Sequence, residues 1–433
     1  MQEEWAEYYA HTRSTMFSWN NGSAPGHLRD AVGRLLLGGI RADVLASAYG
    51  TPLVVMDIAM IQRAIDMFQS SCDPLGLRIS YAAKAFLCAE FARLLSGSGL
   101  AMDVCSLGEL RVAESGGFRP ERLTLHGAGK TDGELEAAVA GRAGRIVLDG
   151  LSDLRRLAEL AKGGRAVSII LRLNTGVSID THSHVRTVGG DAKFGLVPGE
   201  EPDAIAAIQN EPALKFAGLH AHAGSQIFDC ASLAANVAQL RAAADRFAAH
   251  GLICRTLIAG GGFGVQSDPR RPQDALDIGA AIAACTDNAV GSESAPALPI
   301  IEFEPGRAIV AHAGTTLYEI LAVKWRPSRN VVIVDGGMAD NPRPAMYGAY
   351  HHVVPAVETS EALRATRVFG RACEQDFIAD SMLPRNLERG DLLAVCTTGA
   401  YTHSMSSRYN RFPSPTVVAV HEGTHAMWIP ASD

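Results

Sequence analysis

The sequence predicts an α/β barrel followed by a mostly β C-terminal domain. Eight short runs of apolar and β-branched residues lie between residues 78 and 304, and segments with helical spacing separate most of them. This alternation favours parallel strands, and eight such units fit a TIM-like (β/α)8 barrel. From about residue 314, strand-like runs follow one another at short intervals. A doubly wound open sheet would have the same periodicity and stays the structural alternative.

The barrel strands are expected at residues 78–82, 101–105, 123–126, 145–149, 167–173, 216–222, 255–259 and 299–304. Apolar residues recur at helical spacing in the intervals, most clearly over 89–97, 132–141, 152–164 and 231–251. Strands of the second domain are expected at 315–325, 329–337, 391–396 and 415–423. We therefore divide the chain into an N-terminal segment (1–48) that packs with the β domain, a barrel (49–313) and a β domain (314–433).

The composition narrows the class of protein. The 433 residues are 47% hydrophobic and 20% charged, which excludes a largely disordered chain. The net charge of -7 argues against nucleic acid as a partner. The eight cysteines include no C-x-x-C pair, which indicates reduced thiols. Because we find neither an apolar signal core nor a run of about 18 apolar residues, we expect a cytoplasmic protein without a membrane partner.

Polar residues and glycines gather where the predicted strands end. In a barrel, the residues at the carboxyl ends of the strands form the active site. The residues at these positions are Lys84, Asp103, His126, His222, Ser225, Gly260, Gly261, Gly262, Glu304, Gly306 and Arg307. Their position at one end of otherwise apolar strands indicates a site rather than a packed core.

Lys84 lies in YAAKAF, directly after the first strand and between small apolar residues. Burial disfavours the ammonium form of a lysine, and a partly neutral lysine can form a Schiff base with an aldehyde. Taken alone, a surface lysine at a strand end is the simpler interpretation.

Two glycine-containing motifs could bind an anion. GGGFG ends an apolar strand, where bare backbone amides can approach a phosphate, although Val265 breaks the G-x-G-x-x-G pattern of a dinucleotide site. EPGR places Glu304, Gly306 and Arg307 within four residues, and arginine suits a phosphate or a carboxylate. A tight turn and an ion-paired turn are the structural alternatives.

The HAHAG motif could contribute to a metal site, because His220 and His222 share one face of a strand. No third and fourth ligand at a suitable spacing is evident, so we expect no metal.

Together, these motifs resemble those of the fold-type III decarboxylases that use pyridoxal phosphate (PLP), and within that group the diaminopimelate decarboxylases (ornithine/diaminopimelate/arginine decarboxylase family 2). YAAKAF resembles the cofactor-lysine motif, and HAHAGSQ, GGGFG and EPGR match in order and spacing. DGGMADNPRPAMYGAYH, the CE of RACEQD and GAYTHSMSSRYN continue the match. The resemblance extends from Tyr49 to about Val420.

The resemblance implies PLP as the cofactor, held covalently by Lys84. His222 would stack on the pyridine ring, and Glu304 would face the ring nitrogen and keep it protonated, which makes the ring a better electron sink. Asp103 would lie near the Schiff base. The other implied cofactor-binding residues, most of them around the phosphate, are Ser225, Gly261, Gly262, Gly306, Arg307 and Tyr401.

The resemblance also implies how the substrate binds. Arg343 and Tyr347 would bind its distal carboxylate, and Glu374 its distal ammonium. Cys373 would enter from the partner subunit of a homodimer with shared active sites and help to protonate the product carbon. The implied substrate-binding residues are Arg307, Arg343, Tyr347, Glu374 and Tyr401, and the implied catalytic residues are Lys84, His222 and Cys373.

Two motifs depart from the family pattern. The usual CES-x-D is here Cys373-Glu374-Gln375-Asp376, and Ala128 stands in HGAGK where asparagine is usual. The first departure lies in the loop that would read the distal end of the substrate. There, glutamine is bulkier than serine, and Asp376 is expected to add charge nearby.

The resemblance therefore implies a lyase of amino-acid metabolism that converts meso-diaminopimelate to L-lysine and CO2 in lysine biosynthesis. The altered loop keeps open a paralogue that decarboxylates a modified or D-configured diamino acid, such as D-lysine, D-ornithine or a siderophore or secondary-metabolite intermediate. A racemase, a non-enzymatic PLP-binding protein and a metal hydrolase are more distant alternatives.

Overall fold

The computed structural model describes residues 27–176, 193–269, 275–286 and 299–432. Contacts between residues divide the chain into two compact units. One comprises residues 66–264 and 278–306, and the other comprises residues 1–65, 265–277 and 307–433. We describe each unit separately and call them the barrel unit and the sheet unit.

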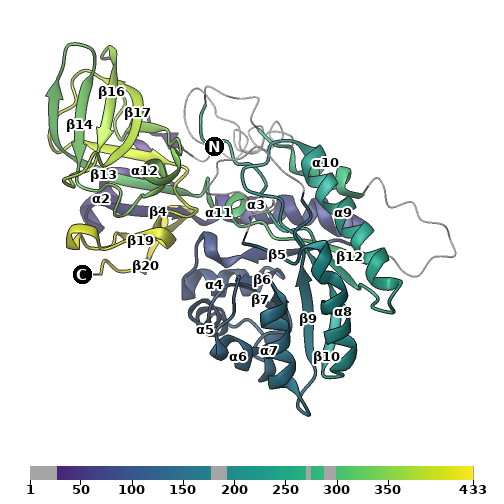
Figure 1. Ribbon diagram of the computed structural model, residues 1–433. Helices are drawn as coiled ribbons and strands as arrows, with labels where there is room; N and C mark the ends of the chain where they lie inside the picture. Colours follow the sequence, from purple (N-terminus) through teal and green to yellow (C-terminus); the bar gives the residue numbers. More distant parts are fainter. Residues whose placement is uncertain (1–26, 177–192, 270–274, 287–298, 433) are drawn as a thin grey trace. The chain divides into compact units, whose positions relative to one another are not determined.

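The barrel unit contains a closed barrel of eight parallel strands (Figure 1). The strands are β5 (Arg78–Ala82), β6 (Ala101–Val104), β7 (Leu123–Leu125), β8 (Arg145–Leu148), β9 (Val167–Arg172), β10 (Leu214–His220), β11 (Thr256–Ile258) and β12 (Ile300–Phe303). β12 pairs with β5 and closes the ring, with Glu302 opposite Arg78. The prediction of a (β/α)8 barrel is confirmed, and each predicted strand overlaps an observed one.

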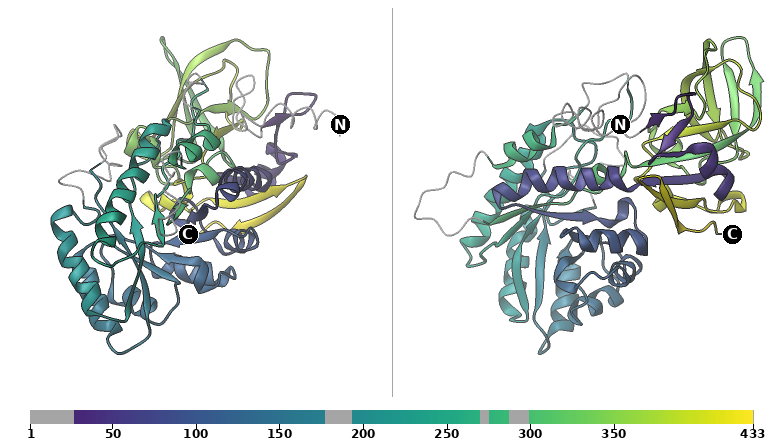
Figure 2. Two further views of the ribbon diagram at one scale, coloured as in Figure 1. Left: turned by 90° about the vertical axis from the view of Figure 1, so that its right-hand side faces the viewer. Right: turned by 180° about the vertical axis from the view of Figure 1, so that it is seen from behind.

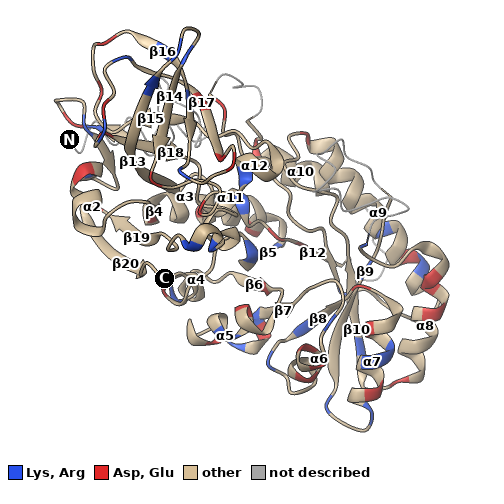
Figure 3. Ribbon diagram, turned by 60° about the vertical axis from the view of Figure 1, so that its left-hand side comes forward, with Lys and Arg blue, Asp and Glu red and all other residues tan. Residues whose placement is uncertain are grey.

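Helices cover the outside of the barrel, as the views in Figure 2 show. They are α4 (Ala89–Gly97), α5 (Leu107–Ser115), α6 (Asp132–Val139), α7 (Leu151–Ala161), α8 (Glu201–Asn210), α9 (Cys230–Ala248) and α10 (Ile278–Thr286). Capping residues mark where these helices begin. At α6, Thr131 and Glu134 form a capping box. Figure 3 marks the charged positions on α7 and α8, which carry the polar faces of amphipathic helices.

The barrel strands are almost entirely buried, as expected for parallel strands covered by helices. In β5, every residue after Arg78 is buried. Side chains alternate along a strand, so Arg145 and Val147 lie on the same face of β8. Val147 forms an apolar cluster with Ile170 and Ile258. Ion-paired side chains share the barrel with this apolar layer, as described below.

The sheet unit contains a nine-stranded sheet with a central path β17-β16-β14-β13-β4-β19-β20. Its strands are β4 (Leu53–Asp57), β13 (Gly314–Trp325), β14 (Asn330–Val334), β15 (Val353–Pro355), β16 (Leu363–Phe369), β17 (Phe377–Pro384), β18 (Leu392–Cys396), β19 (Thr416–His421) and β20 (Thr424–Ile429). The mostly β C-terminal domain is therefore confirmed. β4 lies within the range 49–313, and it pairs with β13 and β19 of this sheet.

Shorter elements complete the chain. β1 (Leu28–Arg29), β2 (Leu35–Leu37) and β3 (Ile40–Arg41) form a three-stranded sheet, followed by α2 (Ala42–Tyr49). The amide of Leu35 donates to the carbonyl of Ala356, so this sheet packs within the sheet unit. α3 (Ile58–Cys72), α11 (Arg307–Val310) and α12 (Arg343–Tyr347) are the remaining α-helices of the described residues. None of the helices in these residues is both long and apolar enough to span a membrane.

Candidate active site

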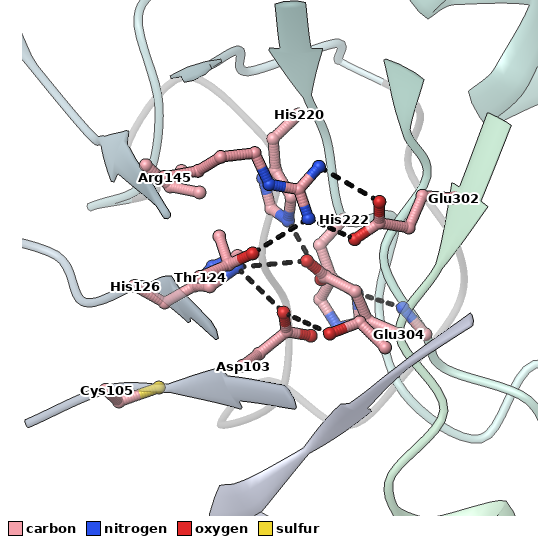
Figure 4. A network of polar contacts seen from close by, with 12 residues as sticks. Asp103, Cys105, Thr124, His126, Arg145, His220, His222, Glu302 and Glu304 are labelled. Carbon is pink, nitrogen blue, oxygen red and sulfur yellow. Dashed lines mark hydrogen bonds and ion pairs between the residues drawn. The ribbon is translucent and has the colours of Figure 1, made fainter. Parts of the chain in front are cut away.

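A buried carboxylate, Glu304, lies at the carboxyl end of β12 and is the centre of a polar network in the barrel (Figure 4). Its amide donates to the carbonyl of Gly260, which fixes the residue against the end of β11. Oε1 lies 3.0 Å from Nε2 of His126, and Oε2 is hydrogen-bonded over 3.2 Å to Nε2 of His220. Two imidazoles therefore flank one carboxylate.

These contacts and the burial of the site determine the charges of Glu304, His126 and His220. Burial opposes ionisation of Glu304, but His126 and His220 outweigh it and hold the pKa of Glu304 well below its usual range. Burial likewise opposes protonation of His126, but Glu304 and then Asp103 raise its pKa to about 9. At His220, burial dominates and lowers the pKa to about 4. Near neutral pH, the network holds an anionic Glu304, a cationic His126 and a neutral His220.

Asp103, in β6, is a second buried carboxyl group in the same network. Ser80 donates its hydroxyl to Oδ1 over 2.7 Å, and Nε2 of His126 lies 3.6 Å from the same atom. Burial, followed by the charge of Glu304, raises the pKa of Asp103 to about 7. The barrel thus holds a carboxyl group that titrates near neutrality beside one that stays ionised.

A buried ion pair lies next to this polar network. Arg145 of β8 donates to both carboxylate oxygens of Glu302, over 3.0 and 2.7 Å, and to the hydroxyl of Thr124 over 2.9 Å (Figure 4). Glu302 is only 1% exposed. Burial opposes the positive charge of Arg145, but Glu302, followed by Asp103 and Glu304, raises its pKa, so the guanidinium also acts on those two carboxylates.

Lys84 lies in a 3-10 turn over Ala83–Ala85, directly after β5. Ala83 and Ala85 are buried, whereas Lys84 is exposed. The reason is local, because the strand ends at Ala82 and the turn directs the middle residue outward. Its positive charge nevertheless acts on Cys105, Glu109 and His222, which places the lysine at the same end of the barrel as those groups.

His222 follows β10, and its Nδ1 accepts a hydrogen bond from the amide of Gly261 over 3.3 Å. An accepting Nδ1 carries no proton, and burial, followed by the charge of Lys84, lowers the pKa of His222 well below its usual value. The imidazole is therefore neutral and its ring is anchored to the glycine-rich turn. Ser225 lies three residues further on and is half-buried.

The glycines of this turn are required by close backbone approaches. A Cβ at Gly261 would overlap the carbonyl oxygen of Glu304, and one at Gly262 would overlap that of Gly224. Gly306 lies similarly close to Ala82, at the end of β5. These glycines bring bare backbone to the ends of β11 and β12, a feature that fits a phosphate.

The sheet unit gathers two guanidinium groups around one tyrosine. The guanidinium carbon of Arg307 lies 4.7 Å from the ring centre of Tyr401, and that of Arg343 lies 5.8 Å from it. Arg343 also lies 5.6 Å from the ring centre of Tyr347. Burial, followed by repulsion from Arg307, lowers the pKa of Arg343 to about 9. Two guanidinium groups beside one aromatic ring suit an anionic ligand.

Cys373 and Glu374 lie in the loop between β16 and β17, and both are exposed. Glu374 accepts a hydrogen bond from the hydroxyl of Tyr409. Cys373 is the only exposed residue among the eight cysteines, all of which are free thiols. Asp376, expected to add charge to this loop, is instead buried, and its carboxylate accepts hydrogen bonds from backbone amides.

The sequence anticipated where the strand-end residues lie, but it missed how they pair. The sequence places His126 after a strand but does not predict its pairing with Glu304. It suggests His220 only as a metal ligand together with His222. The structure instead groups His220 with His126 and Glu304, whose ligand atoms lie within 4.8 Å of one another.

Comparisons with known proteins identify a matching family and several similar proteins. Residues 58–311 match the family model described as the pyridoxal-dependent decarboxylase, pyridoxal binding domain. The chain is 39% identical to a diaminopimelate decarboxylase of Mycobacterium tuberculosis, covering 91% of this chain and 92% of that protein. It is 38% identical to one of Bacillus subtilis, covering 90% and 91%. Among solved structures, diaminopimelate decarboxylase from M. jannaschii in complex with L-lysine has a TM-score of 0.87 at 27% identity, covering 94% and 95%.

Proposed function

Since this chain belongs to the family of pyridoxal-dependent decarboxylases, we propose that it converts meso-diaminopimelate to L-lysine and CO2. The observation that carries the substrate assignment is the pair of guanidinium groups of Arg307 and Arg343, which lie 4.7 and 5.8 Å from the ring centre of Tyr401. Such a pair suits a substrate that presents an extra carboxylate. The relatives named above, which act on diaminopimelate, support the same substrate.

The residues of the barrel unit fit PLP. Glu304 supplies a buried anion, which a protonated pyridine nitrogen would require as its partner. Gly261 and Gly262, together with Ser225, would hold the phosphate, with Gly306, Arg307 and Tyr401 completing the set. His222 would lie against the ring, and Lys84 would hold the cofactor covalently. Asp103 would lie near that linkage.

When bound, PLP supplies an electron sink for the electron pair that remains on Cα as CO2 departs. The chain's own residues set the conditions for this chemistry. Glu304, kept ionised by His126, would hold a proton at the ring nitrogen and so favour electron withdrawal. Arg145 supports the charge of Glu304 from below. Neutral His222 can cover the ring without adding a charge that would compete with that proton.

Residues of the sheet unit would bind the distal end of the substrate. Arg343, with Tyr347, would bind the distal carboxylate, and Arg307 and Tyr401 would support the same anion. Glu374 would bind the distal ammonium. Cys373 would deliver the proton that replaces CO2 at Cα, so that the C–C bond is exchanged for a C–H bond at the same carbon. These groups supply the opposite charges that a distal amino-acid head group requires.

We place these groups in a homodimer with shared active sites, in which Cys373 enters from the partner subunit. The exposure of the Cys373 loop in a single chain supports this arrangement. The eight free thiols support a reducing compartment such as the cytoplasm.

One observation favours a second substrate. Gln375 is exposed beside Glu374, where the family pattern has a serine. A longer amide at this point could fit a modified or D-configured diamino acid, such as D-lysine or D-ornithine.

The test is formation of CO2 and L-lysine from meso-diaminopimelate by the PLP-loaded enzyme, with Lys84→Ala as the inactive control. L-lysine in a one-to-one ratio with CO2 supports the proposal. If the enzyme releases no CO2 from diaminopimelate but releases CO2 from D-lysine or D-ornithine, the proposal for diaminopimelate is wrong and the second substrate is supported.

A further inference from the structure

The loop between β16 and β17 turns one side chain inward while it exposes the three before it. Cys373, Glu374 and Gln375 are exposed, whereas Asp376 is only 3% exposed. Asp376 has a φ of 42°, in the left-handed region that aspartate tolerates better than most residues. This conformation ends the exposed tip and turns the carboxylate back into the sheet unit.

The carboxylate of Asp376 joins two segments that are far apart in the sequence. Oδ1 accepts from the amide of Met338, 38 residues away, and Oδ2 accepts from the amide of Ala372 over 2.8 Å. The carbonyl of Asp376 accepts from the amide of Gly370 over 2.8 Å, and the amide of Arg371 donates to Gly336 over 3.3 Å. Hydrogen bonds to a charged acceptor are the strong ones in proteins. The two segments are therefore docked through one ionisable side chain.

Three glycines make this docking possible. A Cβ at Gly337 or at Gly370 would overlap the carboxylate of Asp376, and one at Gly336 would overlap the ring of Tyr318. The space for the carboxylate is therefore created by residues without side chains on both segments. The arrangement is built into the sequence at several positions, which a chance contact would not require.

The segment that Asp376 holds leads directly into α12, which begins at Arg343. Within it, the amide of Gly337 donates to Oδ1 of Asp340 over 2.7 Å, and Tyr318 donates its hydroxyl to Oδ2. The amide of Asn341 donates to the carbonyl of Gly337 over 2.8 Å. The segment from Gly336 to α12 is thus internally braced, so a tether at Met338 constrains the start of the helix.

We propose that Asp376 is a positioning residue that fixes the Cys373–Gln375 tip relative to the segment carrying Arg343 and Tyr347. Its two oxygens face backbone amides of the protein rather than the exposed tip. Of the two departures in this loop, Gln375 alone is left facing outward. This inference rests on the proposed function for its effect on substrate binding, but not for the tether itself.

The direct test compares Asp376→Asn with Asp380→Asn in the PLP-loaded enzyme. Asparagine has one acceptor oxygen, so it can satisfy Met338 or Ala372 but not both with its oxygen. Asp380 is a matched control on the adjacent strand, because its carboxylate pairs with Arg367 on the surface. The readouts are hydrogen–deuterium exchange over residues 336–342 and 370–376 and the KM for diaminopimelate.

We expect Asp376→Asn to speed exchange over 336–342, a segment that does not contain the substitution, and to raise KM on the order of tenfold. Asp380→Asn should change neither the exchange over residues 336–342 nor the KM for diaminopimelate. Unchanged exchange over 336–342 would overturn the tether, and faster exchange with an unchanged KM would overturn its role in substrate positioning. If the wild type does not decarboxylate diaminopimelate, the proposed substrate fails while the exchange experiment still decides the tether.

The wild-type enzyme gives an independent check if Asp376→Asn does not fold. The amides of Met338 and Ala372 should exchange much more slowly than that of exposed Gln375. Equal exchange rates at the three amides would overturn the proposal.

Discussion

Nε2 of His126 lies 3.0 Å from Oε1 of Glu304, in a part of the barrel where both side chains are buried. Each group changes the titration of the other: Glu304 raises the pKa of His126 to about 9, and His126 holds the pKa of Glu304 well below its usual range. This pair keeps an anion ready at the position proposed for the pyridine nitrogen, so it links the packing of the barrel to the chemistry of decarboxylation.

Glu304→Gln should lower kcat for CO2 release on the order of a hundredfold or more, because a neutral amide cannot hold a proton at the ring nitrogen. Steady-state kinetics with meso-diaminopimelate at saturating PLP provide the measurement. Glu136→Gln, an exposed change on α6, is the control. A kcat within a factor of two of the wild type would exclude the assigned role of Glu304.

His126 should stabilise the fold in a pH-dependent way. Its pKa is about 9 in the folded state against an ordinary 6.5, so its contribution is complete below pH 6.5 and is lost as the pH rises through about 9. The full contribution is about 3 kcal/mol, at 1.36 kcal/mol per pKa unit. Urea unfolding of wild type and His126→Gln between pH 6 and 9.5 measures it. The difference in unfolding free energy should shrink as the pH rises.

Breaking the Arg145–Glu302 pair should destabilise the barrel. Glu302→Ala leaves a largely buried guanidinium without its carboxylate, at a cost of about 3–5 kcal/mol. The matched control is Asp203→Ala, which removes an exposed partner of Arg155 and should cost less than about 1 kcal/mol. Equal unfolding free energies for the two variants would show that breaking the buried ion pair costs no more stability than breaking the exposed one.

Arg343→Met should raise the KM for diaminopimelate on the order of tenfold or more, because it removes a cation from the distal carboxylate site. L-lysine retains that carboxylate, so inhibition by the product should weaken in parallel. Initial-rate measurements with added L-lysine test both effects. A raised KM with unchanged L-lysine inhibition would contradict the assignment of Arg343 to the distal end.

The shared site can be tested by mixing two inactive variants. Lys84→Ala and Cys373→Ala homodimers should each be inactive, and random exchange of subunits should restore about a quarter of wild-type activity, since half of the dimers hold one intact site. Activity after co-refolding is the readout. Proven subunit exchange without recovery would exclude a site shared between subunits.

Local sequence was enough to predict the eight barrel strands, because each is a short apolar run between turn and helix signals. It was also enough to place Lys84, His222 and Glu304 at strand ends. The polar partners could not be predicted in this way. Arg145 and Glu302 are 157 residues apart, and only closure of the barrel brings them together. Such pairs leave no periodic signal in either segment.

The same limit applies to the sheet unit. β4 has the apolar pattern of a strand, but the pattern does not say that it pairs between β13 and β19. Asp376 was read as an added charge because it follows Glu374 and Gln375 in sequence. Its positive φ and the glycines at 336 and 337 turn it inward, and those are properties of the backbone rather than of composition.

The most direct test of the central claim is the ratio of kcat/KM for meso-diaminopimelate to that for D-lysine. D-lysine has the same reacting centre and a distal ammonium, but it lacks the distal carboxylate that Arg307 and Arg343 are proposed to bind. A site built around that carboxylate should prefer diaminopimelate by about a thousandfold or more. A ratio near one, or a preference for D-lysine, would contradict the account and assign the chain to a different diamino acid.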